Sequence, residues 1–141
     1  MRFKGVLIGA SILWFGLSAG AQGGETFKAR LSPVPIDAAT ASTIAGAGSI
    51  TAVVTGTNLS ITGTFEGLRS AATVARLHNG PKGIRGPAVF DLTVTKATSG
   101  TISGALRLTP AQVENLKNCR FYVQIHSERA PEGNLWGWLL R

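Results

Sequence analysis

Apolar and polar residues alternate along most of the chain after residue 25, and this alternation constrains the fold more than any other feature. Phe90, Leu92 and Val94, for example, are interleaved with Asp91 and Thr93. Successive side chains of a β-strand point to opposite faces, so such a segment has one apolar face and one polar face. Strands of this kind are typical of antiparallel sheets that pack one face on a core and expose the other.

Eight segments show this pattern, each bounded by Gly, Pro, Asn or Ser. They are residues 26–31, 49–54, 59–65, 74–78, 89–95, 101–108, 120–126 and 134–140. The pattern predicts an all-β fold, an antiparallel β-sandwich of about eight strands with immunoglobulin-like or Greek-key connections. Gly63 and Gly104 fall inside two of these strands, where glycine indicates a bulge or close packing.

One short helix is expected within this β pattern, at residues 110–117. Thr109 provides a side-chain cap, Pro110 stands at the first helical position, and Gln112 completes a capping box. Val113 and Leu116 give the segment an apolar side. We expect this helix to close one end of the sandwich.

The first 21 residues are typical of a cleaved secretory signal. Arg2 and Lys4 precede a mainly apolar run at residues 6–17, and the segment 18–21 ends in a small-x-small pattern. The alternative is a permanent anchor, but the apolar run is shorter than the roughly 20 residues that span a bilayer. We therefore expect a periplasmic or secreted protein with no stable membrane span after cleavage, and a single domain at residues 22–141.

The charge of the chain gives little information about its partners. The formal net charge is +7, and removal of Arg2 and Lys4 with the signal leaves +5. The remaining basic residues are scattered from Lys28 to Arg141, whereas nucleic-acid binding usually needs a basic stripe or patch. We expect no nucleic-acid partner, but a protein or carbohydrate at the cell envelope or outside the cell. The sequence makes no prediction of oligomeric state.

Sequence motifs of catalysis are absent from the chain. It has no Gly-x-Ser-x-Gly, no Walker loop, no Cys-x-x-Cys and no His-Glu-x-x-His. The glycine-rich segment 80–86 is read as a loop between strands, and the only close-set acidic pair is Glu128 and Glu132. Cys119 is the single cysteine, so no intrachain disulfide is possible, and we expect a buried thiol. These features favour a module that is not an enzyme and needs no cofactor.

The order of short motifs over about 110 residues resembles the CHRD domain family, first described in chordin and found in many secreted bacterial proteins. The matching residues are Phe27-x-Ala29-x-Leu31, Pro33-Val34-Pro35, Gly67-Leu68, Leu77-His78-x-Gly80-Pro81-x-Gly83-x-x-Gly86-Pro87-x-Val89, Leu116, Phe121-Tyr122-Val123-x-Ile125-His126-Ser127 and Pro131-Glu132-Gly133-x-Leu135-x-Gly137. The resemblance implies an immunoglobulin-like or related β-sandwich. It also implies an extracellular binding or structural module.

The chain departs from the family at positions that resemble a polar site. The family typically has His-x-His where this chain has Arg76 and His78, and Arg-Gly-Gln where it has Trp136 and Trp138. It also has a Glu before the Val-Pro segment, where this chain has Ser32. Relative to the family, the cationic residue thus stands on the earlier strand, as Arg76, and an aromatic residue stands on the later one, as Trp136. We expect Arg76 to stack on Trp136 if their strands are neighbours.

Strand periodicity indicates which of these side chains share a face. If the strands at 74–78, 120–126 and 134–140 lie in one sheet, their faces away from the core gather polar and aromatic residues. The predicted ligand- or partner-binding patch consists of Arg76, His78, Tyr122, Gln124, His126, Trp136 and Trp138. Trp, Tyr and Arg are the residues that most often dominate binding interfaces. The alternative is structural: a loop covers the tryptophans, and the histidines bond to neighbouring backbone.

Metal binding is the second functional alternative. His78 and His126 are the imidazoles of the chain, with Asp91, Glu128 and Glu132 as possible further ligands of zinc or copper. Such sites generally use three or four ligands. Replacement of the first His of the family unit by Arg76 weakens this alternative, so we do not predict a metal.

Overall fold

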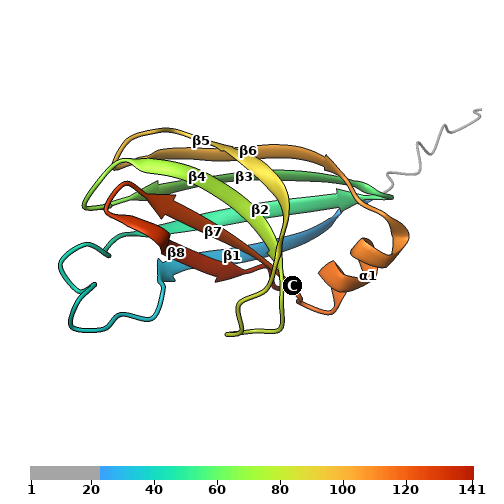
Figure 1. Ribbon diagram of the computed structural model, residues 1–141. Coiled ribbons are helices and arrows are strands. Elements are labelled where there is room, and N and C mark those ends of the chain that lie inside the picture. Colours follow the sequence, from blue (N-terminus) through green and yellow to red (C-terminus); the bar gives the residue numbers. More distant parts are fainter. Residues whose placement is uncertain (1–22) are drawn as a thin grey trace, which may run out of the picture.

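The structure is a computed structural model that describes residues 23–141 (Figure 1). The predicted signal at residues 1–21 lies outside the described residues. Eight strands and one helix follow one another along the chain. Their bounds are β1 (Glu25–Pro33), β2 (Ala47–Thr55), β3 (Asn58–Glu66), β4 (Ala72–Asn79), β5 (Ala88–Val94), β6 (Gly100–Arg107), α1 (Pro110–Lys117), β7 (Phe121–Ser127) and β8 (Ala130–Trp138). All eight predicted strands and the predicted helix are confirmed, although β8 begins four residues earlier than expected.

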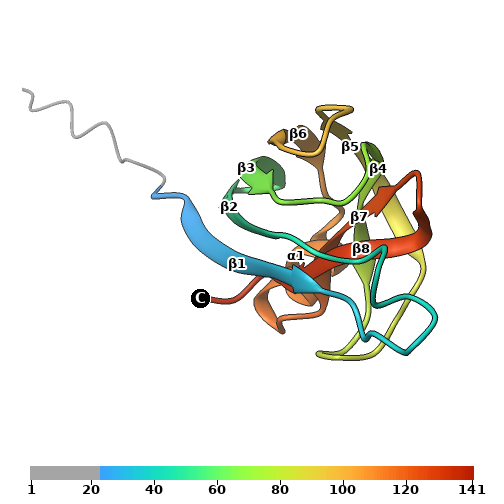
Figure 2. The same cartoon turned by 90° about the vertical axis from the view of Figure 1, so that its left-hand side faces the viewer.

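The strands close into one antiparallel barrel instead of an open sandwich. Their order around the barrel is β1-β2-β3-β6-β5-β4-β7-β8, and β8 returns to β1 (Figure 2). The prediction of a sandwich is wrong on this point. A sandwich and a closed barrel both bury one face of each strand, so the alternation of apolar and polar residues is the same in the two architectures.

Two short seams close the barrel. β1 and β8 pair at Ser32 with Trp136 and at Pro33 with Leu135, and an isolated bridge joins Lys28 to Leu140. β5 and β6 also pair at only two positions. At the first seam, a Cβ at Gly137 would collide with the carbonyl of Arg30, so glycine lets β1 approach this closely. The seams pair the strand edges that an open sheet would expose.

The connections form a Greek key. β4, β5 and β6 are neighbours in chain order, whereas β3 lies beside β6 and not beside β4. The edge of β4 away from β5 is therefore free to pair with β7. This topology brings residues 72–79 next to residues 121–127, although more than 40 residues of chain separate the two segments.

The barrel interior is filled with aliphatic and aromatic side chains. The large residues that are almost completely buried there include Phe27, Leu31, Ile50, Leu59, Ile61, Leu77, Ile102, Leu116, Phe121, Ile125 and Leu135. Gly63 and Gly104 lie in regular pairings without a register shift. A Cβ at Gly63 would collide with the carbonyl of Ser49, so close packing explains this glycine, and no bulge is present.

Helix α1 lies at one end of the barrel, as expected (Figure 1). The capping box is present: the Thr109 hydroxyl accepts from the Gln112 amide at 3.2 Å, and Gln112 Oε1 accepts from the Thr109 amide at 2.8 Å. Leu116 is fully buried and Val113 packs against the core. Cys119, expected to be a buried thiol, is instead partly exposed just beyond the helix, with a left-handed φ of 57°. In residues 23–141, no helix is both long and apolar enough to span a membrane.

Candidate functional site

The outer face of β4, β7 and β8 collects the side chains singled out from the sequence. β7 pairs with β4 on one side and with β8 on the other, which confirms that the three strands lie in one sheet. Register places the side chains in two rows, with His78, Tyr122 and Trp138 in one and Arg76, Gln124 and Trp136 in the other. His126 lies opposite Val74, further along the same face.

This face is largely covered rather than open. Tyr122 is only 1% exposed and Gln124 only 3%, although both point away from the barrel core. Two loops lie over the face: residues 80–87, between β4 and β5, and residues 34–46, between β1 and β2. The arrangement agrees with the structural alternative, in which loops cover the aromatic residues.

Side chains of the sheet hold the loop at 80–87 by hydrogen bonds, of which Tyr122 and Trp138 make three. The Tyr122 hydroxyl accepts from the Gly86 amide at 2.9 Å and donates to the Gly86 carbonyl at 3.1 Å. Trp138 donates its indole Nε1–H to the Gly80 carbonyl at 2.9 Å. A Cβ at Gly86 would collide with the Asn79 carbonyl, so this close approach of loop to strand requires glycine.

The loop at 34–46 builds a second, smaller apolar cluster on the same face. Val34, Ile44 and Ala130 are buried there, and the half-buried Trp136 packs against them. A turn in this loop is fixed by Asp37, whose Oδ1 accepts from the amides of Ala39 and Thr40, both at 2.9 Å. The hydrogen bonds from Thr40 and Ala39 lower the pKa of the Asp37 carboxyl.

Aromatic rings form a continuous run between the two loops. The His78 ring stacks on Tyr122 with 4.8 Å between centroids, and Tyr122 lies 4.4 Å from Trp138. Trp138 in turn meets Trp136 edge-on, at 4.8 Å and an interplanar angle of 71°. His78, Trp136 and Trp138 remain partly exposed, so this run of rings connects the covered part of the face to its surface.

The expected contact between Arg76 and Trp136 is not formed. β7 lies between β4 and β8, so the two residues are two strand spacings apart, about 10 Å. Arg76 Nε instead donates to Asp91 Oδ1 on β5, at 3.0 Å. The cation over Trp136 is Arg85, whose guanidinium carbon lies 5.9 Å from the ring centroid.

Both histidines bond to backbone carbonyls through the same ring nitrogen. His78 Nδ1 lies 2.9 Å from the Gly86 oxygen, and His126 Nδ1 lies 2.8 Å from the Pro131 oxygen. A carbonyl oxygen can only accept, so Nδ1 carries the hydrogen in both rings and Nε2 of the neutral ring keeps a free lone pair. Both Nε2 atoms are buried and have no hydrogen-bond partner.

Burial and positive neighbours keep His78 neutral. Burial of the imidazole lowers its pKa, and the hydrogen bond to the Gly86 carbonyl opposes this effect. His126 in its protonated form and the guanidinium groups of Arg76 and Arg85 lower the pKa of His78 further.

Among residues 23–141, no carboxylate forms a metal-binding cluster with the two histidines. Asp91 is engaged by Arg76, and residues 23–141 contain no cluster of three or more His, Cys, Asp and Glu side chains that could hold a metal. The two rings themselves lie 6.5 Å apart between centroids, inclined by 30°.

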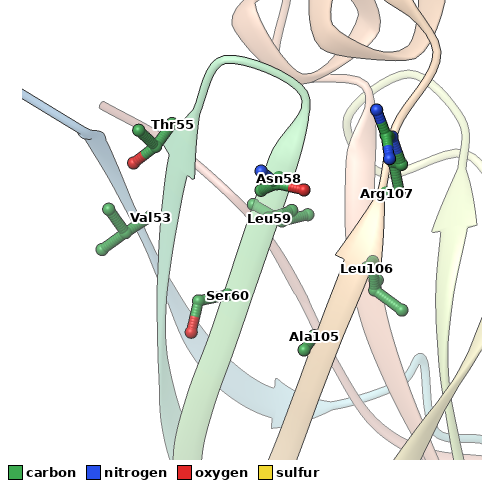
Figure 3. Close-up of a pocket in the computed structure, with 8 residues that line it drawn as sticks. All are labelled: Val53, Thr55, Asn58, Leu59, Ser60, Ala105, Leu106 and Arg107. Atoms are coloured by element: carbon green, nitrogen blue, oxygen red, sulfur yellow. The ribbon is translucent and has the colours of Figure 1, made fainter. Parts of the chain in front are cut away.

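A hollow of about 200 Å³ between residues 40–44 and 129–133 borders this face, and other hollows lie elsewhere on the barrel surface. One, of about 400 Å³, lies where β2, β3 and β6 run side by side near one barrel end (Figure 3). It is lined by Val53, Thr55, Asn58, Leu59, Ser60, Ala105, Leu106 and Arg107. This lining offers no acid, no histidine and no thiol, so it provides neither a general base nor an activated nucleophile.

The described residues form an antiparallel Greek-key barrel. One outer face of this barrel carries an aromatic and cationic surface framed by two loops. The family model described as the CHRD domain matches residues 27–139, nearly the whole chain. The chain belongs to the CHRD domain family, as the order of its motifs predicted. Comparison with curated proteins and with solved structures gives no significant match.

Two residues that organise this face, Arg85 and Gly86, were not predicted from the sequence. Arg85 covers Trp136, and its Nη1 donates to the Glu132 carbonyl at 3.3 Å. Gly86 bonds both Tyr122 and His78. The available signal was their position in the glycine-rich segment 80–86, but a loop's direction over a sheet cannot be read from its composition.

Proposed function

We propose that the chain is an exported, non-catalytic binding module that contacts its partner through the surface formed by Ile84, Arg85, Trp136 and Trp138. We call this the loop-framed surface. The observation that carries the proposal is the position of Arg85 over Trp136, beside a second, partly exposed tryptophan. Ile84, which precedes Arg85, is 59% exposed and adds apolar area to this surface.

The chemistry of the loop-framed surface suits a protein or a carbohydrate. Planar indoles and a guanidinium offer large contact area with few torsions to immobilise, and Trp and Arg are enriched among residues that dominate binding. The surface is also prearranged, because hydrogen bonds from Tyr122 and Trp138 fix the loop that carries Arg85. A prearranged surface loses less conformational entropy when a partner binds.

Membership of the CHRD domain family supports a binding or structural role rather than catalysis. Export is a separate part of the proposal and rests on residues 1–21. Intact-mass measurement of the protein outside the cytoplasm tests it, and retention of Met1 to Ala21 would contradict cleavage.

Site-specific photo-crosslinking tests the loop-framed surface. A benzophenone amino acid at Ile84 should crosslink a partner in the cells that make the protein, and Arg85→Ala should reduce the yield. The matched control is the same amino acid at Thr62, exposed on β3 across the barrel. Equal crosslinking at positions 62 and 84, or at position 62 alone, would contradict the proposed surface. Binding to purified envelope polysaccharides, followed by tryptophan fluorescence, tests the carbohydrate class.

Metal binding is a second candidate function, favoured by one specific observation. His78 and His126 each have a buried Nε2 without a partner, while Nδ1 is fixed by a backbone carbonyl. Metal-bound histidines usually show this arrangement, in which the second nitrogen is oriented by a hydrogen bond. Titration of the chelator-treated protein with zinc and copper salts, with metal content measured after gel filtration, tests this candidate.

A further inference from the structure

Two imidazole nitrogens on the outer face of β4 and β7 are buried and have no hydrogen-bond partner. A buried polar atom without a hydrogen-bond partner is rare in folded proteins and is unfavourable by roughly 1–3 kcal/mol. His78 and His126 leave two such atoms on one face, with the rings 6.5 Å apart. Both lone pairs are on Nε2, because both Nδ1 atoms donate to carbonyls.

We infer that His78 and His126 bind one monovalent copper ion between their Nε2 atoms. This inference rests on the second candidate function, metal binding, and names the ion and its oxidation state. It does not depend on the loop-framed surface.

The number of ligands argues for monovalent copper over zinc and divalent copper. Zinc sites are tetrahedral, and divalent copper prefers four donors in a tetragonal arrangement. Residues 23–141 bring together two imidazoles and no cluster of three or more His, Cys, Asp and Glu side chains. Monovalent copper has a filled d shell, and two nitrogen donors in line are sufficient to hold it.

The spacing of the rings agrees with an in-line geometry. Two metal–nitrogen bonds of about 2.0 Å, added to the two ring radii, place the centroids a little over 6 Å apart when the ion lies in line. A tetrahedral angle at the metal would bring the rings closer together. The observed separation is 6.5 Å, with the ring planes inclined by only 30°.

The charges around the histidines favour an ion of low charge. Arg76 and Arg85 both act on His78, and the carboxylate of Asp91 is already paired with Arg76. Repulsion between a cation and these guanidinium groups scales with its charge, so a monovalent ion experiences half the repulsion of a divalent one.

Aromatic rings complete the surroundings on one side. Tyr122 stacks on His78 at 4.8 Å, and Trp138 lies 4.4 Å beyond Tyr122. Such rings exclude water and present electron-rich faces, which suit a soft, weakly hydrated cation better than a strongly hydrated divalent ion.

The test measures binding of monovalent copper in competition with a colorimetric chelator, under nitrogen and with ascorbate present. It uses Cys119→Ser as the reference protein, because Cys119 is a partly exposed thiol and would itself bind copper. His78→Asn and His126→Asn are the test variants. The Asn amide can replace Nδ1 as donor to the Gly86 or Pro131 carbonyl, while the Nε2 ligand is lost.

We expect one copper ion per reference protein and loss of that ion in each Asn variant, with no displacement by a tenfold excess of zinc. Retention of the ion in either folded variant would overturn the inference. If zinc binds in place of copper and is lost in the same variants, metal binding holds and the assignment to monovalent copper fails. If the reference protein binds neither metal, the metal-binding candidate and the assignment to monovalent copper are both wrong.

A second measurement does not depend on the variants. Monovalent copper is diamagnetic, so its effect on the ¹⁵N signals of both imidazoles can be followed by NMR in the Cys119→Ser protein. We expect Nε2 of both rings to shift with one equivalent of copper, while both Nδ1 signals stay protonated. Absence of a shift at either Nε2 would contradict a shared ion.

Discussion

The guanidinium carbon of Arg85 lies 5.9 Å from the centroid of the Trp136 indole, and Arg85 Nη1 donates to the Glu132 carbonyl at 3.3 Å. Arg85 belongs to the loop between β4 and β5, whereas Trp136 and Glu132 lie on β8. This contact links the loop to β8, the strand that pairs with β1 to close the barrel. It gives the loop-framed surface a defined shape before any partner binds.

The contact between Arg85 and Trp136 should appear as a coupling energy. A double-mutant cycle with Arg85→Ala and Trp136→Leu, measured by urea unfolding, should give about 0.5 to 1 kcal/mol, because the pair is partly exposed. The matched control is Arg76→Ala with Trp136→Leu, which should be additive within about 0.3 to 0.5 kcal/mol. Coupling of Trp136 with Arg76, together with additivity of Trp136 and Arg85, would contradict the assignment of Arg85 as the cation over Trp136.

The hydroxyl of Tyr122 should contribute measurably to the free energy of unfolding. It bonds both the amide and the carbonyl of Gly86 from a ring that is 1% exposed. Tyr122→Phe removes both bonds at a covered site, so we expect a loss of about 1–3 kcal/mol in the free energy of unfolding. Thr93→Val, an exposed hydroxyl on β5, is the control and should stay within about 0.5 kcal/mol. Equal effects of the two changes would mean that the loop is not held in this way.

The metal-free protein should lose stability as the pH falls below 6.5. The pKa of His78 is lowered in the folded protein from an ordinary value of 6.5, mainly by burial. Between the folded and unfolded pKa values, the unfolded chain binds the proton more readily, so the free energy of unfolding decreases as pH falls through this window. Urea unfolding at a series of pH values, in the presence of a chelator, measures the slope. His78→Asn should make the slope shallower, and an unchanged slope would contradict this origin.

The capping box of α1 should contribute measurably to stability, because the helix has only eight residues. Thr109→Ala removes the acceptor for the Gln112 amide and should reduce the free energy of unfolding by about 1 kcal/mol. Thr109→Ser keeps the acceptor and should have little effect. A loss of equal size in both variants would assign the effect to the threonine methyl group.

The strands and the helix could be predicted because local patterns specify them. Alternation marks each strand, and Thr109 with Gln112 marks the helix start. Closure of the barrel could not be predicted, because it depends on two pairings per seam that leave no periodic signal. The family assignment did indicate a β fold, but not how its two seams close.

The residues that share the outer face could also be predicted, but their exposure and partners could not. Tyr122 alternates correctly with Phe121 and Val123, yet it is buried by a loop whose direction no local pattern records. The same loop brings Arg85, not Arg76, to Trp136, since strand order decides that β7 separates β4 from β8. Side-chain orientation is thus a local property of the sequence here, whereas loop position and strand order depend on the whole chain.

The most direct test of the loop-framed surface is an NMR titration of the ¹⁵N-labelled protein with the partner captured at Ile84 or with envelope polysaccharide. The indole Nε1–H signals of Trp136 and Trp138 and the amide signals of residues 80–87 report on this surface. The account predicts that these signals shift with saturation, while the amides of β2, β3 and β6 stay in place. Shifts confined to β2, β3 and β6, with both indole signals unchanged, would contradict it.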